Sequence, residues 1–262
     1  MLNGMTLVLL ISFLIGLTVG SLLNVLICRL PKQESIRGRS RCPHCLRTLE
    51  WFELIPILSC LALRRKCRTC KDTIAWQYPL VELATAVLFS ISVSMHLPES
   101  GALTINSALA IIRDWVVESA IVVTFVTDLK HQLIFDGILI VSGFFALTLT
   151  FVNQAPLLPI FAGGIIGISF FGLQWILSGG RWIGTGDIIL GGFLGIVLGF
   201  PNILICLALA YVAGTMIALP LLLKGSCQWK SKIAFGTFLS AAGIVTLFWG
   251  DAIREWYLQL IM

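Results

Sequence analysis

Long apolar segments recur along this chain of 262 residues, and they constrain its fold more than any other feature. An α-helix needs about 20 predominantly apolar residues to cross a bilayer. Only 12% of the residues are charged, against about a quarter in soluble domains. These features exclude an ordinary soluble protein and predict an all-α polytopic membrane protein. We expect about eight transmembrane helices, over residues 5–28, 79–97, 103–127, 134–152, 155–178, 185–200, 202–223 and 233–250.

Residues 29–78 break this apolar pattern because they are polar, basic and cysteine-bearing. The stretch is too long for a turn, so we expect it to form a small domain of its own. The predicted organisation is a first transmembrane helix in 1–28, which is retained rather than cleaved, a loop domain in 29–78, and a seven-helix membrane domain in 79–262.

The distribution of Lys and Arg predicts the orientation of the chain. Of the 18 Lys and Arg residues, 11 lie in 29–78. Cytoplasmic loops of membrane proteins carry such an excess, so we expect the loop to be cytoplasmic and the N-terminus to lie outside. The net charge of +5 then follows from topology, and the basic loop is expected to face the lipid bilayer rather than a nucleic acid.

The loop carries two C-x-x-C pairs, Cys42–Cys45 and Cys67–Cys70, with 21 residues between them. Two such pairs can supply the four thiolates of a tetrahedral zinc site. Neighbouring basic residues favour thiolates over thiols. We expect structural zinc bound by Cys42, Cys45, Cys67 and Cys70, with no open position for a substrate. Redox or incidental pairing is the alternative, and a reducing cytoplasm disfavours two disulfides.

Asp128 and Asp187 lie at the edges of two apolar segments. Ionisable residues at membrane depth are costly and usually functional. The predicted topology puts both at the cytoplasmic end of their spans, so they are candidates for a carboxylate dyad that activates water, as in aspartic proteases. Gly184 and Gly186, just before Asp187, would leave backbone N–H groups near the start of a helix. The alternative is that the aspartates only cap or end their helices.

Gly191, Gly195 and Gly199 follow Asp187 at four-residue spacing. Small residues at this spacing predict that another helix approaches closely.

Glu53 and Glu82 are further carboxylates in apolar surroundings. Either could bind the amine of a substrate, and the alternative is an ion pair with a nearby Arg. Asp114 and Glu118 lie deeper in the third predicted span and are assigned no role.

Five segments, in order along the chain, resemble motifs of the type IV prepilin peptidase family: Gly16–Pro31, Arg41–Cys45, Trp51–Ser59, Cys67–Cys70 and Tyr78–Glu82. The segment headed by Asp128 resembles the family's Asp-to-Ile-Pro-Asp motif. Gly184-Thr185-Gly186-Asp187 is similar to its glycine-x-glycine-Asp motif, which presenilin-like proteases share. The resemblance covers nearly the whole chain.

The resemblance implies a bifunctional enzyme of the bacterial inner membrane, with a periplasmic N-terminus. Asp128 and Asp187 would cut the leader of type IV prepilins and pseudopilins after a glycine at the cytoplasmic face. The N-terminal half would methylate the new N-terminal residue with S-adenosylmethionine around the zinc loop. The motifs do not locate the methyl-donor site, for which Glu53 and Glu82 are the candidates. Type IV pilus and type II secretion systems are the implied setting.

Four positions depart from the family pattern. Phe135 stands where the family has Pro, and Ile189 where it has Lys. The final motif, usually Pro-Phe-Gly-Pro-Phe, reads Ala234-Phe235-Gly236-Thr237-Phe238. These changes leave the dyad and the cysteines intact. They admit an alternative, a divergent non-catalytic zinc-loop membrane assembly factor of a pilus or secretion system. A transporter would need a polar site near the midplane, where only Asp114 and Glu118 could lie.

Overall fold

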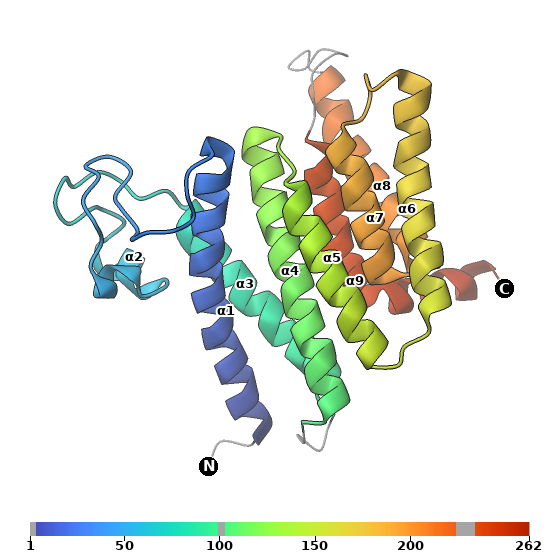
Figure 1. Cartoon of the computed structure of the whole chain (residues 1–262), viewed down its shortest axis with the longest axis horizontal. Coiled ribbons are helices and arrows are strands. Elements are labelled where there is room, and N and C mark those ends of the chain that lie inside the picture. Colours follow the sequence, from blue (N-terminus) through green and yellow to red (C-terminus); the bar gives the residue numbers. More distant parts are fainter. Residues whose placement is uncertain (1–3, 99–102, 224–233, 262) are drawn as a thin grey trace. The chain divides into compact units, whose positions relative to one another are not determined.

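The computed structural model describes residues 4–98, 103–223 and 234–261 (Figure 1). In these ranges the regular secondary structure is helical, with two isolated antiparallel β-bridges, Arg41 with Thr48 and Lys66 with Thr73. The all-α prediction is therefore confirmed for this part of the chain.

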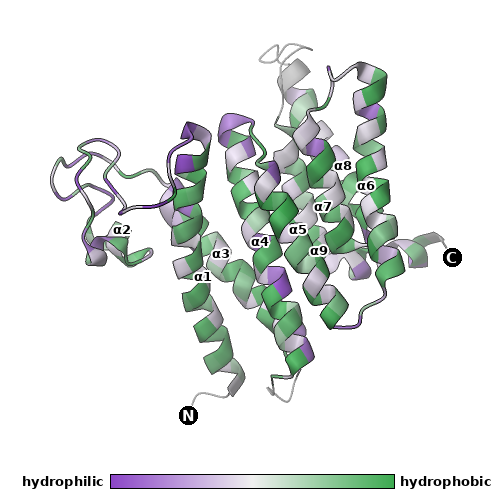
Figure 2. Ribbon diagram, viewed as in Figure 1, coloured by the Kyte–Doolittle hydropathy of each residue, from purple (hydrophilic) through white to green (hydrophobic). Residues whose placement is uncertain are grey.

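Eight longer helices account for most of the described residues: α1 (Gly4–Arg29), α3 (Gln77–His96), α4 (Ile105–His131), α5 (Asp136–Val152), α6 (Leu157–Ser178), α7 (Thr185–Leu198), α8 (Asn202–Leu223) and α9 (Phe235–Ile261). Short helices η1 (Leu30–Lys32), η2 (Trp51–Leu54) and α2 (Leu58–Ala62) lie between α1 and α3. The hydrophobic colouring of Figure 2 covers most of the long helices, whereas hydrophilic residues gather in the segment between α1 and α3.

Each predicted span overlaps one of these helices, although residue 233, the predicted start of the last span, lies outside the described residues. Five of the described helices are long and apolar enough to cross a membrane, namely α1, α3, α6, α8 and α9. Helix α7 has 14 residues, about 21 Å at 1.5 Å per residue, which is shorter than a hydrocarbon core of about 30 Å. Eight crossings therefore remain a prediction.

Helix α4 continues four residues past the predicted end of its span, to His131. Asp128 consequently lies inside the last turn of the helix rather than beyond it. The helix also carries five charged residues, which explains why it is not among the five apolar helices. Helix α9 likewise runs to Ile261 instead of ending near residue 250.

The chain folds into two compact units, residues 1–123 and 124–262. The segment between α1 and α3 belongs to the first unit, and the predicted functional division at residues 28 and 78 stays a prediction. In the first unit α1 packs closely on α3. A Cβ added at Gly16 or Gly20 would lie 2.5 Å from the Cα of Ala86 or 2.7 Å from that of Glu82, so only glycine permits this approach.

In the second unit α7 packs against α5, α6, α8 and α9. Its contact with α6 is backbone against backbone. A Cβ on Gly191 would overlap Phe171, and one on Gly195 would overlap the carbonyl of Gly163. The predicted close approach of another helix to the glycine stripe is therefore confirmed, and α6 is that helix.

Candidate functional site

The four cysteines of the two C-x-x-C pairs come together in the first unit. The sulfurs of Cys42 and Cys70 are 3.8 Å apart, those of Cys45 and Cys67 are 4.0 Å apart, and all four lie within 4.8 Å of one another. These distances are too long for disulfides, whose S–S bond is about 2.05 Å. Zinc with Zn–S bonds of about 2.3 Å would hold tetrahedral sulfurs about 3.8 Å apart. The cluster could therefore hold a metal ion.

The electrostatics of the cluster also fit a bound cation. Backbone N–H groups of Cys70 and Thr69 lower the pKa of Cys67 to about 6. The backbone N–H of Asp72 lowers the pKa of Cys70, but burial and the neighbouring sulfurs raise it more, to about 11. Four crowded thiols cannot all ionise without a compensating charge, and a divalent metal ion supplies that charge.

Glu53 is buried and pairs with Arg47, whose Nη2 lies 2.6 Å from the Glu53 Oε1. The other carboxylate oxygen accepts the backbone N–H of Glu50 at 2.8 Å. Burial raises the pKa of Glu53, but these hydrogen bonds outweigh it and hold the pKa below its usual range. Arg47 also bonds Cys67. The ion-pair alternative for Glu53 is therefore confirmed, and the pair joins the two cysteine turns.

Glu82 of α3 is also buried, but its partners are neutral groups of the first unit. One carboxylate oxygen accepts the backbone N–H of Ile57 at 2.8 Å, and the Ser21 hydroxyl bonds the same carboxyl group. Ile57 has a φ of 61°, a left-handed conformation that is rare for a β-branched residue. Glu82 thus fixes a strained residue of the loop segment against α1 and α3.

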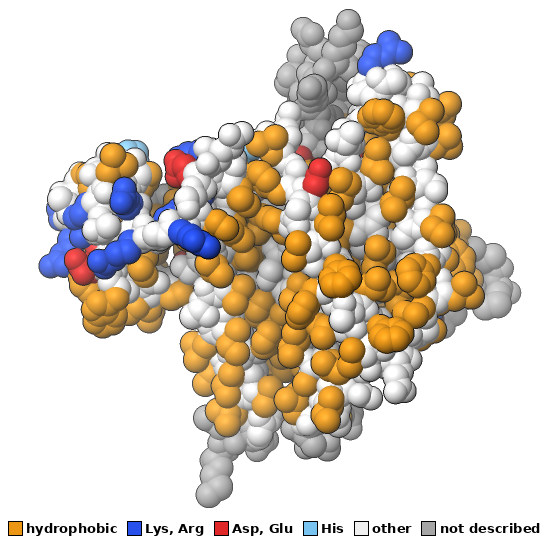
Figure 3. All heavy atoms as spheres, viewed as in Figure 1, with side chains coloured by type: hydrophobic (Ala, Val, Ile, Leu, Met, Phe, Trp, Pro, Cys, Tyr) orange, Lys and Arg blue, Asp and Glu red, His pale blue; other side chains and the backbone are white. Residues whose placement is uncertain are grey.

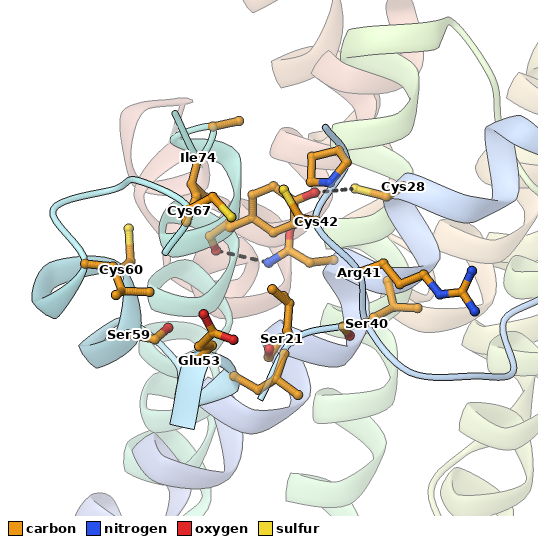
Figure 4. A pocket seen from close by; sticks show the side chains of 18 of the residues that line it. Ser21, Cys28, Ser40, Arg41, Cys42, Glu53, Ser59, Cys60, Cys67 and Ile74 are labelled. Carbon is orange, nitrogen blue, oxygen red and sulfur yellow. Dashed lines mark hydrogen bonds between the residues drawn. The ribbon is translucent and has the colours of Figure 1, made fainter. Parts of the chain in front are cut away.

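A cavity of about 290 Å³ lies between α1, the loop segment and α3 (Figure 4). Its lining includes Asn24 of α1, Cys42 and Cys67 of the cluster, and both Glu53 and Glu82. Figure 4 shows that the Arg41 guanidinium points away from the other labelled side chains. Small-molecule sites typically enclose about 300–1,000 Å³, so the volume is at the lower end of that range. The structure therefore brings two of the four metal-binding candidates and the two glutamates to one cavity.

Asp128 lies in the last turn of α4 and is 5% exposed. Its Oδ2 accepts two hydrogen bonds from Thr237, one from the backbone N–H at 2.6 Å and one from the hydroxyl at 3.0 Å. Thr237 is in the first turn of α9, where backbone N–H groups have no acceptor within the helix. A Cβ on Gly236 would lie 2.9 Å from the same oxygen, so glycine permits this approach.

Asp187 lies in the first turn of α7 and is half-buried. Its Oδ2 accepts the backbone N–H of Gly184 at 3.3 Å, a local bond at the start of the helix. Gly186 contributes differently, because a Cβ there would lie 2.8 Å from the Cβ of Ile134. Gly184 is the N-cap residue of α7, and Asp187 supports the start of the helix from the third position rather than capping it. This bond leaves the second oxygen of the carboxylate for other partners.

The structure brings Asp128 and Asp187 into electrostatic range of each other within the second unit. Ile134, in the connection between α4 and α5, lies close to both Gly186 and Gly236. Gly186 immediately precedes Asp187 in the sequence, and Gly236 lies against the carboxylate of Asp128. The pair is therefore assembled from the end of α4 and the starts of α7 and α9. Two carboxyl groups held this way share one proton more readily than they ionise together.

An aromatic cluster lies near Asp187. Tyr211 of α8 lies within electrostatic range of Asp187, and its ring centroid is 4.9 Å from that of Phe235. Phe170 and Phe171 of α6 extend the cluster through edge contacts. The cluster places aromatic rings of α6, α8 and α9 on the side of Asp187 where Tyr211 lies.

A second polar cluster lies in the first unit. The Ser92 hydroxyl bonds Glu118, which is fully buried and whose Oε2 has no hydrogen-bond partner among the described residues. His96 and Arg113 both pair with Asp114, at 2.7 Å and 2.6 Å. Glu118 and Asp114 are therefore buried between α3 and α4.

Sequence reasoning did not assign Thr237, Ile134 or the aromatic cluster to the site. The contact of Thr237 with Asp128 spans 109 positions, and no local pattern signals it. The sequence offered one signal for Thr237: it is a hydroxyl residue at the start of an apolar helix, and it stands where the family motif usually has Pro.

Two regions of the chain match known protein families. Residues 14–96, which include the four cysteines, match the Bacterial Peptidase A24 N-terminal domain. Residues 115–219, which include Asp128 and Asp187, match the Type IV leader peptidase family.

Relatives match almost the full chain. A protein from Aeromonas hydrophila named Prepilin leader peptidase/N-methyltransferase is 35% identical over 94% of this chain and 92% of its own length. Proteins of the same name from Legionella pneumophila and Bacillus subtilis (strain 168) are each 31% identical. These cover 94% and 96% of this chain, and 92% and 98% of their own lengths. No solved structure gives a significant match.

Proposed function

Because this chain belongs to the type IV leader peptidase family, we propose that it removes the leader of prepilins and pseudopilins after a glycine and N-methylates the new N-terminal residue. The family and the names of the relatives support a membrane protease with methyltransferase activity that acts on prepilins. The finer assignments below rest on this chain's own residues.

The observation that carries the peptidase proposal is the convergence of Asp128 and Asp187 from α4 and α7. We assign cleavage to this pair, with one carboxylate ionised and one protonated. Such a pair activates a water molecule and protonates the leaving amine. Gly184 and Gly186 support it, the first by donating to Asp187 and the second by admitting Ile134.

The cleavage site is proposed to lie at the cytoplasmic face of the inner membrane. The supporting observation is charge, since Figure 3 shows Lys and Arg side chains gathered over the segment between α1 and α3. A basic loop stays on the cytoplasmic side, and the N-terminus is then periplasmic. An extended leader can present its scissile bond there, whereas an intact transmembrane helix shields its peptide bonds.

Cys42, Cys45, Cys67 and Cys70 would hold Zn²⁺ in the first unit. The sulfur spacing and the conflict between the ionisation of Cys67 and Cys70 support this assignment. A site of four thiolates has no open position, so its role is to stabilise the fold of a segment with little core of its own.

The cavity beside the cysteines is the proposed site of S-adenosylmethionine, which would supply a methyl group from its sulfonium. A cationic sulfonium suits a cavity lined by carboxylates, and Glu53, Asp72 and Glu82 all contribute to its wall. The carboxylates of Glu53 and Glu82 are engaged by backbone N–H groups and Arg47, so we assign them to shaping the cavity. Asn24 and Tyr78 border the same space.

The test is cleavage of a prepilin with a Gly–Phe or Gly–Met junction, in membranes that contain wild type, Asp128→Asn or Asp187→Asn. The readouts are leader removal and the mass of the new N-terminus. We expect wild type to give a shortened product with one added methyl group, and both variants to give none. Cleavage that survives either substitution would contradict the dyad.

The departures at Phe135, Ile189 and Ala234 favour one competing function, a non-catalytic assembly factor. In that case wild type would leave the prepilin intact. A pilus or secretion phenotype would then survive both aspartate substitutions but be lost on Cys42→Ser or Cys67→Ser.

A further inference from the structure

The two aspartates have different hydrogen-bond surroundings. Asp128 is almost fully buried, and one of its oxygens receives two bonds from Thr237, at 2.6 Å and 3.0 Å. Asp187 is half-buried and receives one longer bond, at 3.3 Å, from Gly184. Hydrogen bonds donated to a carboxylate favour its ionised form, and short charge-assisted bonds do so most strongly.

The bonds to Asp128 are built by the start of α9. The N–H of Thr237 has no acceptor inside its own helix, so it is available to an outside carboxylate. Gly236 lacks the Cβ that would come within 2.9 Å of the Asp128 Oδ2. Thr237 is itself buried, at 8% exposed, so its two bonds to Asp128 are largely shielded from solvent. The two bonds from Thr237 orient this carboxylate and oppose the cost of burying its ionised form.

The neighbouring groups leave this asymmetry in place. Helix α9 presents Gly236 and Thr237 to Asp128, and the connection before α5 presents Ile134, all of them uncharged. Asp187 on α7 lies within electrostatic range of Asp128, and Tyr211 of α8 lies within electrostatic range of Asp187. Two neighbouring carboxylates disfavour a double anion, so ionisation of Asp128 leaves the remaining proton on Asp187.

From this geometry we propose that Asp128 is the ionised, proton-accepting member of the dyad, that Asp187 is the protonated, proton-donating member, and that Thr237 is the positioning residue that sets this order. The proposal rests on the proposed peptidase function and assigns the roles within it.

The assignment gives a balanced reaction. The oxygen of water bonds to the scissile carbonyl carbon while Asp128 takes one water proton and Asp187 gives its proton to the carbonyl oxygen. The C–N bond then breaks as the nitrogen receives the proton held by Asp128. A hydroxyl proton of the intermediate returns to Asp187, which leaves a carboxylic acid, an amine and the starting dyad.

Three substitutions of Thr237 test the assignment, in full-length protein assayed for prepilin cleavage across pH. Thr237→Val removes the hydroxyl and keeps the N–H, Thr237→Pro removes both donors, and Thr237→Ser keeps both. Proline is tolerated in the first turn of a helix, and valine matches the shape of threonine, so Thr237→Val carries the test if the proline variant does not fold.

We expect the acid limb of the pH–rate profile to move to higher pH, by about half a unit in Thr237→Val and about one unit in Thr237→Pro. On that limb kcat should fall about tenfold in the proline variant, with KM within about twofold of wild type. Thr237→Ser should restore the wild-type profile. A purely structural role would lower activity at every pH and lower the melting temperature in parallel.

The outcomes distinguish a failure of the Thr237 role from a failure of the proposed peptidase function. Wild-type pH profiles in the folded valine and proline variants, combined with inactive Asp128→Asn, would overturn the role of Thr237 and leave the dyad standing. Cleavage by Asp128→Asn would instead overturn the proposed peptidase function itself.

Discussion

Glu82 of α3 accepts the backbone N–H of Ile57 at 2.8 Å, which joins this helix to a loop residue 25 positions earlier. Ile57 has a φ of 61°, which is unfavourable for a β-branched residue. The hydrogen bond from its N–H to Glu82 helps to hold this conformation. The bond fixes one wall of the cavity in the first unit, because Glu82 and the neighbouring Ser59 and Cys60 all line it. Cavity shape in this unit therefore depends on one buried carboxylate.

Replacing Glu82 by Leu should release the loop segment and impair methylation more than cleavage. Loss of the acceptor leaves the Ile57 N–H unpaired, at a cost of about 1–3 kcal/mol to the free energy of unfolding. We expect N-methylation to fall more than about tenfold, with cleavage within about twofold of wild type. Mass spectrometry of the mature N-terminus measures both.

Glu82→Gln keeps an acceptor oxygen and serves as the matched control. Full methylation by Glu82→Leu would contradict the cavity as the methyl-donor site.

The cysteine cluster should bind about one zinc ion per chain. Cys67→Ser removes a ligand, so we expect zinc content to fall to background and protease cleavage within residues 33–76 to increase. Chelation of wild type should have the same effect. Metal analysis and limited proteolysis are the measurements.

Cys60→Ser is the control for that experiment, because Cys60 lies in the same segment but outside the cluster. It should retain zinc and protease resistance. Zinc retained by Cys67→Ser, or a wild-type protein without zinc, would contradict the assignment.

The sequence predicted the positions of the helices, because apolar runs bounded by charged or turn residues are local signals. It predicted the cysteine cluster for the same reason, since each C-x-x-C pair is a local pattern that can supply two thiolate ligands to a shared metal ion. The ends of α4 and α9 were predicted less well, because a polar residue such as Asp128 interrupts the apolar run without ending the helix.

The partners of the site residues could not be predicted in the same way. The bond from Thr237 to Asp128 and the contact of Ile134 with Gly186 depend on how α4, α7 and α9 pack. The sequence left an ion pair open for both Glu53 and Glu82, and only tertiary packing assigned Arg47 to the first and Ile57 to the second.

The close contact between α6 and α7 should make Gly167 intolerant of any side chain. A Cβ on Gly167 would overlap the carbonyl of Gly191, so Gly167→Ala must push the two helices apart. We expect a loss of stability of about 1–3 kcal/mol and a parallel loss of cleavage, because α7 carries Asp187. Thermal unfolding in detergent and the prepilin assay are the measurements.

Gly172 is the matched control on the same helix, since a Cβ there would meet nothing within 4 Å. Gly172→Ala should be neutral, or stabilising by up to about 1 kcal/mol, because alanine favours helix over glycine. Equal behaviour of the two variants would show that α6 and α7 do not pack as described.

Ser92 and Glu118 form a buried hydrogen bond. Removing the Ser92 hydroxyl alone should lower stability more than replacing both residues by apolar ones. Ser92→Ala removes the bond to Glu118, whose other oxygen already has no partner, so we expect a loss of about 1–3 kcal/mol in the free energy of unfolding. Adding Glu118→Leu should recover most of that loss, since an apolar side chain needs no partner. Thermal unfolding of the two single variants and the double variant measures the coupling.

Prepilin cleavage should continue in the double variant, because Glu118 belongs to the first unit and the aspartate pair to the second. A double variant that is stable but inactive would assign Glu118 a role in the reaction that packing alone does not explain.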